Sequence, residues 1–234
     1  MNSAHMRAFW DARAREDPFY FVDNRRPYRS GKSEGFWEDG ERDLDRMLAL
    51  LGLRLSSSDV AVDIGCGVGR LTRVIARRAA FVHAIDVSPE MVERARARNP
   101  DLDGVEWIVG DGVSLRPLGD ASVDACVSHV VFQHLPDPLL TLGYVAEIGR
   151  VLRPAGWAAL QVSNDPRAHR STSGGLRRVA AALGRAPRGQ TDPAWLGSAV
   201  ELDDLRAVAL RSGLELERIV GEGTQVCLIR ARKR

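Results

Sequence analysis

The sequence predicts an α/β fold in which a mostly parallel sheet carries helices on both faces. The first reason is residues 60–78, where an apolar run leads into a glycine-rich turn and then a helical pattern. The second is a series of four short apolar runs, three of which end in an acid. The third is a pair of C-terminal runs, 214–221 and 224–231, joined by a short Glu-Gly link. Such a link permits only an antiparallel hairpin, whereas the earlier runs are separated by the helical crossovers that parallel pairing needs.

The N-terminal elements are two helical patterns, at 4–16 and around 36–51, with aromatic residues in and between them. The stretch 18–35 between them is rich in Arg, Pro, Ser and Gly and is expected to be a loop. The first strand, 60–64, then meets glycines at every second position from 65 to 69. Glycine permits a tight turn and lets a ligand approach the backbone closely, so this turn is a candidate cofactor cradle.

The later elements repeat this alternation of apolar strands and helices. The second run, 81–86, ends in Asp86 and leads to Ser88 as helix N-cap and Pro89 as first helical residue. The third and fourth runs are 105–109 and 123–128, and a fifth strand is expected at 157–163. An amphipathic helix over 201–213 then precedes the hairpin.

Size and composition fit one globular protein. The 234 residues are enough for a sizeable core, with 44% hydrophobic and 27% charged residues. A net charge of +2 is too small to indicate a nucleic-acid partner, and no run of 18 apolar residues predicts a membrane span. The N-terminus is too polar for a signal peptide, and three cysteines without paired spacing favour reduced thiols in the cytoplasm. No cluster has metal-ligand spacing, so no metal is expected.

The order of acid and glycines in the turn indicates which cofactor it holds. A dinucleotide fingerprint needs Gly-x-Gly-x-x-Gly, but here Arg70 falls where the third glycine belongs. Asp63 comes before the glycines, where a carboxylate would repel a pyrophosphate and attract an ammonium group. S-adenosylmethionine carries an ammonium, a carboxylate, a ribose and an adenine, and no phosphate.

The run Asp63-Ile64-Gly65-Cys66-Gly67-Val68-Gly69 resembles the first motif of class I S-adenosylmethionine-dependent methyltransferases. The similarity runs from about residue 60 to residue 163 and is greatest to the small-molecule group that includes the quinone-biosynthesis enzymes. It implies a Rossmann-like sheet of seven strands with a C-terminal antiparallel hairpin and an N-terminal helical cap. It also implies S-adenosylmethionine as methyl donor, S-adenosylhomocysteine as product, and a small-molecule acceptor. The family usually has two glycines before the fifth strand; Ala155 replaces the first, which we expect to matter little.

The resemblance also implies the residues that hold the donor. Asp86 is placed to take the ribose hydroxyls, Val87 and Met91 to cover adenine, and Asp111 to accept from the adenine amino group. The full set of predicted cofactor-binding residues is Asp63, Gly65, Cys66, Gly67, Arg70, Asp86, Val87, Met91, Asp111, Gly112, Ser128, Tyr20 and Tyr28.

Two segments outside the motifs are expected to shape the pocket. Residues 1–45 are predicted to form a cap over the domain at 46–234, because such segments in the family fold over cofactor and substrate. Aromatic faces attract a sulfonium cation, which selects Tyr20 and Tyr28 for the cofactor and Trp37 for the substrate; the alternative is that these rings only pack helices onto the sheet. The insertion at 165–200 carries six arginines and no acid between Asp165 and Asp192. Arg177 and Arg178 are therefore predicted to bind an anionic acceptor, unless the segment is only a solvated loop.

Methyl transfer is an in-line displacement, and an oxygen acceptor also needs a base. His134 is the first candidate base and His129 the second, because the pKa of histidine suits proton transfer near neutrality and the resemblance implies that both lie in the loop over the reacting methyl group. Alternatively, His134 orders that loop or caps the helix that begins near Pro136. Two other functions stay open: a S-adenosylmethionine-binding scaffold or regulator without catalysis, and an NAD-linked oxidoreductase. The protein is expected to be a monomer or a homodimer.

Overall fold

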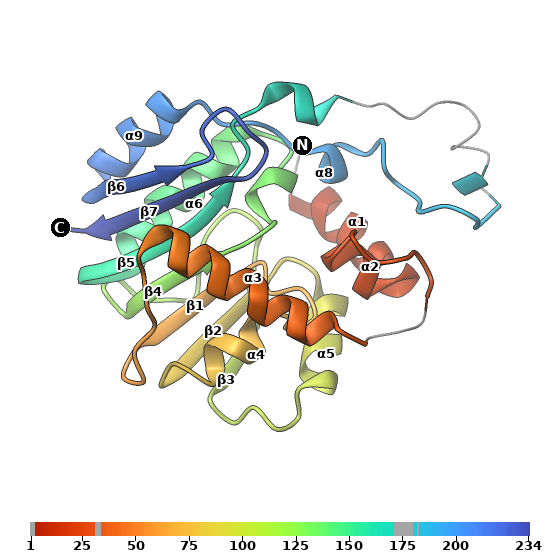
Figure 1. Cartoon of the computed structure of the whole chain (residues 1–234), viewed down its shortest axis with the longest axis horizontal. Coiled ribbons are helices and arrows are strands. Elements are labelled where there is room, and N and C mark those ends of the chain that lie inside the picture. Colours follow the sequence, from red (N-terminus) through yellow and green to blue (C-terminus); the bar gives the residue numbers. More distant parts are fainter. Residues whose placement is uncertain (1–2, 31–33, 171–179, 182) are drawn as a thin grey trace.

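A seven-stranded sheet with strand order β3-β2-β1-β4-β5-β7-β6 forms the centre of the molecule (Figure 1). The computed structural model describes residues 3–30, 34–170, 180–181 and 183–234. Strands β1 to β5 pair in parallel, and β7 lies antiparallel to both β5 and β6. The predicted fold class is therefore confirmed. The strands are β1 Val60–Ile64, β2 Phe81–Asp86, β3 Val105–Val109, β4 Val123–Ser128, β5 Leu152–Val162, β6 Leu214–Val220 and β7 Cys227–Lys233.

Helices cover both faces of this sheet (Figure 1). The helices are α1 Ser3–Glu16, α2 Pro18–Val22, α3 Phe36–Leu51, α4 Thr72–Ala76, α5 Pro89–Arg98, α6 Pro138–Val151, α8 Pro193–Leu196 and α9 Leu202–Arg211, with 3-10 turns η1 Phe132–His134 and η2 Pro166–His169. None of the helices within the described ranges is long and apolar enough to cross a membrane.

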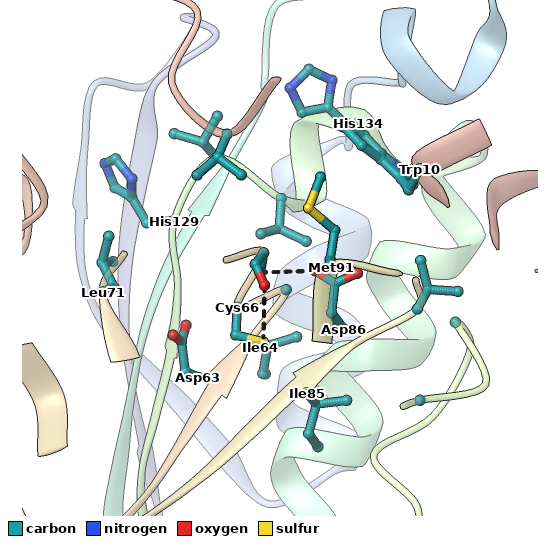
Figure 2. Close-up of a pocket in the computed structure, with 18 of the residues that line it drawn as sticks. Trp10, Asp63, Ile64, Cys66, Leu71, Ile85, Asp86, Met91, His129 and His134 are labelled. Atoms are coloured by element: carbon teal, nitrogen blue, oxygen red, sulfur yellow. Dashed lines mark hydrogen bonds between the residues drawn. The ribbon is translucent and has the colours of Figure 1, made fainter. Parts of the chain in front are cut away.

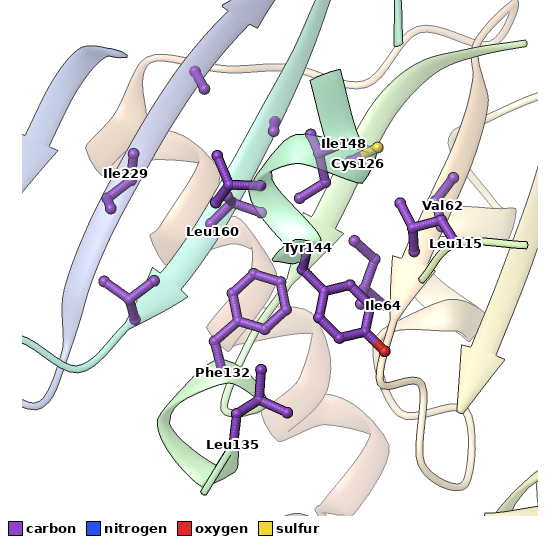
Figure 3. Close-up of a cluster of buried hydrophobic side chains, with 14 of the residues drawn as sticks. Val62, Ile64, Leu115, Cys126, Phe132, Leu135, Tyr144, Ile148, Leu160 and Ile229 are labelled. Carbon is purple, nitrogen blue, oxygen red and sulfur yellow. The ribbon is translucent and has the colours of Figure 1, made fainter. Parts of the chain in front are cut away.

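Alternation along the strands separates two hydrophobic clusters. Val62 and Ile64 of β1 point to one face, where α6 and α9 pack, and Ala61 points to the other, where α3 and α4 pack. Figure 3 shows the first cluster, with Tyr144 and Ile148 of α6 above the side chains of the central strands. The central strands are thus buried on both faces, as expected for a parallel sheet.

Four Asp-Pro pairs begin helical turns, and two of these turns differ from expectation. Asp137 caps α6 by accepting from Leu139 N at 2.9 Å, and Asp165 likewise begins η2. Asp17 begins α2, inside the stretch predicted to be a loop, and Asp192 begins α8 within the insertion. In each case proline occupies an early helical position where no N–H is needed, and the preceding carboxylate caps the backbone.

Helices α1 and α2 lie side by side between α5 and α8 (Figure 1). Asp11 on α1 accepts a hydrogen bond from Ser88 Oγ at 2.5 Å and another from Glu90 N at 3.1 Å, at the first turn of α5. On the same helix, Arg7 donates to the carbonyl of Gly110 at 3.1 Å. These contacts hold α1 across the loops that follow β2 and β3.

Candidate active site

A cavity of about 1000 Å³, its open mouth included, lies where β1, β2 and β4 end. Asp63 and Asp86 lie within it, with Cys66 between them and His134 and His129 on separate walls (Figure 2). The lining includes these predicted residues: Asp63, Gly65, Cys66, Gly67, Arg70, Asp86, Val87, Met91, Gly112, His129 and His134. The carboxyl edge of a parallel sheet is where ligands bind in open α/β folds.

The glycine turn supplies one wall of the cavity as bare backbone. Gly65 N and Cys66 N both donate to the Ile85 carbonyl, at 2.7 and 3.0 Å, and tie the turn to β2. Gly65 and Gly67 have φ of 75° and 54°, in the left-handed region that favours glycine. A Cβ on Gly65 would lie 2.4 Å from Val131 Cγ2, so only glycine allows the loop after β4 to approach.

Two carboxylates, those of the buried Asp63 and the half-buried Asp86, face the cavity beside this turn. Asp86 accepts from Gly67 N and from Ser88 N, each at 2.9 Å, and Asp63 accepts from Thr72 Oγ1 at 2.5 Å. Burial raises the pKa of Asp86 to about 6, against the lowering effect of its backbone hydrogen bonds. Burial also raises the pKa of Asp63 to about 6, and the negative charge of Asp86 adds to this rise.

Two side chains at the Asp63 end of the cavity each have one polar atom without a hydrogen-bond partner among the described residues. Arg70 is 3% exposed and binds Asp43 Oδ2 at 2.6 Å through one terminal nitrogen, but its Nε has no hydrogen-bond partner among the described residues. The buried Nδ1 of His129 has none in that part of the chain either. Burial, with the nearby Arg70 cation, lowers the pKa of His129 to about 4. Buried polar atoms are usually hydrogen-bonded, so these two atoms beside the cavity can bind a polar ligand or water.

His134 lies at a different wall, among aromatic rings. Its Nδ1 is 2.7 Å from the Trp195 carbonyl oxygen, and its ring centroid is 5.6 Å from that of Trp10 and 5.1 Å from that of Trp195. Figure 2 shows His134 beside Trp10, whereas His129 lies above Leu71 on the far side of Asp63. Burial lowers the pKa of His134 to about 4, so the imidazole is neutral near pH 7.

Comparison with known proteins shows which family part of the chain resembles. Residues 62–160 match the family model described as a methyltransferase domain. Over these residues the chain is similar to class I S-adenosylmethionine-dependent methyltransferases. The matched part includes the glycine turn, both carboxylates and both histidines of the cavity.

Curated relatives that match this part of the chain act on different substrates. Demethylmenaquinone methyltransferase of Tropheryma whipplei is 30% identical over 122 residues, which are 52% of this chain and 49% of that protein. Malonyl-[acyl-carrier protein] O-methyltransferase of Serratia marcescens is 36% identical over 108 residues, which are 46% of this chain and 40% of the relative. The chain therefore spans less than half the length of these two relatives.

Solved structures share the fold at low identity. A methyltransferase from Mesorhizobium loti superposes with a TM-score of 0.62 at 21% identity, covering 83% of this chain and 99% of that one. Phosphoethanolamine N-methyltransferase 1 of Haemonchus contortus, solved with phosphoethanolamine and S-adenosylhomocysteine, gives a TM-score of 0.67 at 17% identity, covering 98% of this chain and 48% of that chain.

Several residues predicted for the site lie outside the cavity lining. The Asp111 carboxylate accepts from Val113 N, Ser114 N and Ser114 Oγ, and these bonds with the adjacent chain fold a local turn. Burial raises the pKa of Asp111 but its hydrogen bonds lower it further, and the net direction is downward. Ser128 is fully buried and donates to the Ile64 carbonyl at 3.1 Å, which joins β4 to β1.

The three aromatic residues predicted for the pocket also lie elsewhere. Tyr28 donates to Glu16 Oε1 at 2.5 Å, and its ring centroid is 5.4 Å from that of Tyr20. The Arg73 guanidinium lies over the Trp37 ring, with its central carbon 4.9 Å from the ring centroid. These contacts agree with the alternative in which the rings pack the cap. The predicted acceptor residues Arg177 and Arg178 lie outside the described residues.

Other side chains of the cap line the cavity instead. Trp10 of α1 and Phe21 and Val22 of α2 face it, together with Tyr144 of α6. The sequence marked Trp10 and Phe21 as aromatic but did not show which ring faces inward. Val130 has φ of 58°, uncommon for a β-branched residue, in the loop between β4 and η1. Within the described ranges, no three side chains of metal-binding type come together.

Proposed function

We propose that this protein transfers the methyl group of S-adenosylmethionine to a small-molecule acceptor. The observation that carries the proposal is the charge layout of the cavity. The carboxylates of Asp63 and Asp86 lie beside a bare glycine turn, and the buried Arg70 and half-buried His129 each have one polar atom with no partner among the described residues. This layout suits a zwitterion with a sugar, because carboxylates accept from ammonium and hydroxyl groups while Arg70 and His129 can bind a carboxylate.

Each group of the donor would have a partner among the lining residues. Asp63, Arg70 and His129 would hold the amino-acid end, Asp86 the ribose, and Val87 and Met91 the adenine. When bound, S-adenosylmethionine would supply a methyl group already activated by a sulfonium. The chain itself then contributes alignment and exclusion of water, and such positioning is worth up to roughly 7–11 kcal/mol.

The cap supplies the exclusion of water in this proposal. Residues 1–45 cover the cavity through Trp10, Phe21 and Val22, and Asp11 fastens α1 to the start of α5. We infer that the cap opens to admit the donor, because Val22 packs directly on Gly67.

His134 is the side chain best placed to receive a proton from an acceptor. It is neutral near pH 7 and lies in the aromatic part of the cavity with Trp10 and Phe21, which suits an acceptor with a flat apolar body. His129 lies at the amino-acid end instead, which favours a binding role. The relatives' acceptors differ widely, so the nucleophile and the acceptor of this protein have to be identified by experiment.

Calorimetry with S-adenosylmethionine, S-adenosylhomocysteine and NAD tests the donor assignment. We expect binding of the first two and none of NAD. Binding of NAD alone would contradict the proposal and favour the oxidoreductase alternative. Transfer of an isotope-labelled methyl group to a metabolite extract, read by mass spectrometry, then separates an enzyme from a scaffold, which would bind the donor and label nothing. Exchanging both Arg177 and Arg178 for Gln tests the anionic acceptor: unchanged KM for the labelled metabolite would reject it.

A further inference from the structure

His134 is one member of a chain of hydrogen bonds that runs through two glutamines. Gln161 of β5 donates from Nε2 to Gln133 Oε1 at 2.8 Å, and Gln133 Nε2 lies 3.2 Å from His134 Nε2. On the other side, His134 Nδ1 lies 2.7 Å from the Trp195 carbonyl oxygen. Gln133 and Gln161 are 9% and 2% exposed, so both amides are shielded from water.

The groups at the two ends of this hydrogen-bond network determine which atom donates and which accepts in each of its bonds. A carbonyl oxygen only accepts, so His134 Nδ1 must carry the hydrogen. In a neutral imidazole the other nitrogen is then an acceptor, which matches the N–H of the Gln133 amide. That amide presents its N–H group to His134 because its oxygen receives the N–H of Gln161.

We propose that Gln133 and Gln161 are positioning residues which, with the Trp195 carbonyl, hold His134 neutral as the Nδ1–H tautomer, and that His134 Nε2 takes a proton only when both amides turn. This inference rests on the proposed function, since the proton belongs to the methyl acceptor. In the step, the Gln133 N–H first leaves the Nε2 lone pair of His134. The acceptor O–H or N–H bond then breaks, its electron pair stays on the nucleophile, and a new N–H bond forms at His134 Nε2. An acceptor without such a hydrogen gains nothing from this arrangement.

The glutamine pair also limits when His134 can be charged. An imidazolium would direct an Nε2–H at the Gln133 N–H group, and the Gln133 amide cannot turn without losing the bond from Gln161. Gln161 Oε1 is buried and has no hydrogen-bond partner in the described part of the chain, so it would accept from Gln133 if both amides turned. We therefore expect protonation of His134 to require rotation of both amides.

Few other charges act on this histidine. His169 of η2 is the titratable neighbour, and it is engaged by the Leu196 carbonyl at 2.5 Å and Ser163 Oγ at 2.6 Å. On α8, Asp192 pairs with His5 at 3.1 Å, and on α1, Arg13 pairs with Glu16 at 2.9 Å. The tautomer of His134 is thus set mainly by Gln133 and Trp195.

Nitrogen NMR of the full-length protein labelled at histidine tests the proposal without knowledge of the acceptor. The chain has five histidines, and the His134 signals are those lost in His134→Asn. We expect a hydrogen-bearing Nδ1 and a lone-pair Nε2 at pH 7 in the unsubstituted protein. Gln133→Glu should move the His134 titration upward by at least one pH unit, and Gln161→Leu, which frees the Gln133 amide, should move it in the same direction.

Gln190→Leu is the matched control, because this amide contacts the Tyr20 hydroxyl at 3.3 Å and is not a hydrogen-bond partner of His134. It should leave the His134 signals unchanged. An Nε2–H tautomer in the unsubstituted protein would overturn the proposal, even if the variants fail to fold. So would an unchanged titration in both folded glutamine variants. Calorimetry with S-adenosylmethionine on the same samples separates the two ideas, since loss of the proposed function would appear there and leave the tautomer unaffected.

Discussion

Val22 of α2 packs against the bare backbone of Gly67, so the cap can approach the glycine turn because Gly67 has no side chain. A Cβ on Gly67 would lie 2.9 Å from Val22 Cγ2, and Gly67 has φ of 54°. The turn therefore requires glycine for its backbone conformation and again for the approach of the cap.

Gly67→Ala should consequently impair both the fold and the site. We expect a loss of roughly 1–3 kcal/mol in unfolding free energy from the strained backbone. We also expect at least tenfold weaker binding of S-adenosylmethionine, measured by calorimetry, because α2 is displaced. Gly119→Ala is the control, since a Cβ there meets nothing within 4 Å. Normal binding by Gly67→Ala would show that the turn does not contact the donor.

The two carboxylates of the cavity, Asp63 and Asp86, predict how donor binding depends on pH. Asp63 and Asp86 both have a pKa of about 6 in the free protein, so they become neutral as the pH falls from 7.5 to 5. A neutral carboxyl attracts an ammonium less and offers a weaker acceptor to hydroxyls, so the affinity for S-adenosylmethionine should fall through pH 6. The stability of the free protein should change in the opposite direction. The pKa values of these groups are higher in the folded than in the unfolded protein, so they lower the unfolding free energy above pH 6, and this penalty disappears as the pH falls toward 4.

Asp86→Asn should weaken donor binding about tenfold or more at pH 7.5, the scale of a lost hydrogen bond to a charged group. It should also shift the remaining pH dependence to lower pH, because the charge of Asp86 raises the pKa of Asp63. Asp59→Asn, before β1 at the opposite end of that strand, is the control and should bind as the unsubstituted protein does. A pH profile that Asp86→Asn leaves unmoved would exclude Asp86 as its source.

Asp11 predicts how firmly the cap is held. Asp11→Ala removes the bonds from Ser88 Oγ and Glu90 N, and should cost about 1 kcal/mol of stability, the usual scale for a helix cap. Release of S-adenosylhomocysteine, followed by stopped flow, should become faster, and amide hydrogen exchange in α1 should increase. Asp103→Ala, an exposed carboxylate beyond α5, should change neither. Unaltered release with a destabilised fold would mean that α1 does not gate the cavity.

Local patterns in the sequence predicted the sheet and much of the cavity. Each strand end is fixed by an apolar run and the acid or glycine that follows, so Asp63, the glycine turn and Asp86 meet at one edge wherever parallel strands pair. Ser88 and Pro89 likewise begin α5 as predicted, with Ser88 Oγ accepting from Met91 N at 3.1 Å.

Tertiary packing determined what the sequence did not predict. Whether Trp10 or Tyr20 faces the cavity depends on how α1 rests on α5, which no local pattern encodes. The Asp111 carboxylate is held by the turn at 111–114, whose Asp, Gly and Ser residues are typical turn formers. The short helices α2 and α8 could have been predicted, because Asp17-Pro18 and Asp192-Pro193 carry the same signal as Asp137-Pro138.

Ala155 offers a direct test of backbone strain. The sequence suggested that alanine in place of a glycine here matters little, but the residue has φ of 66°, where a Cβ is unfavourable. Ala155→Gly should therefore raise the unfolding free energy by about 1 kcal/mol, the cost of a left-handed conformation less the entropy that glycine adds. Ala207→Gly, an exposed position within α9, should lower it by a similar amount, because glycine is a poor helix former. Urea unfolding of the two variants beside the unsubstituted protein measures both, and a loss of stability in Ala155→Gly would show that the left-handed turn costs alanine nothing.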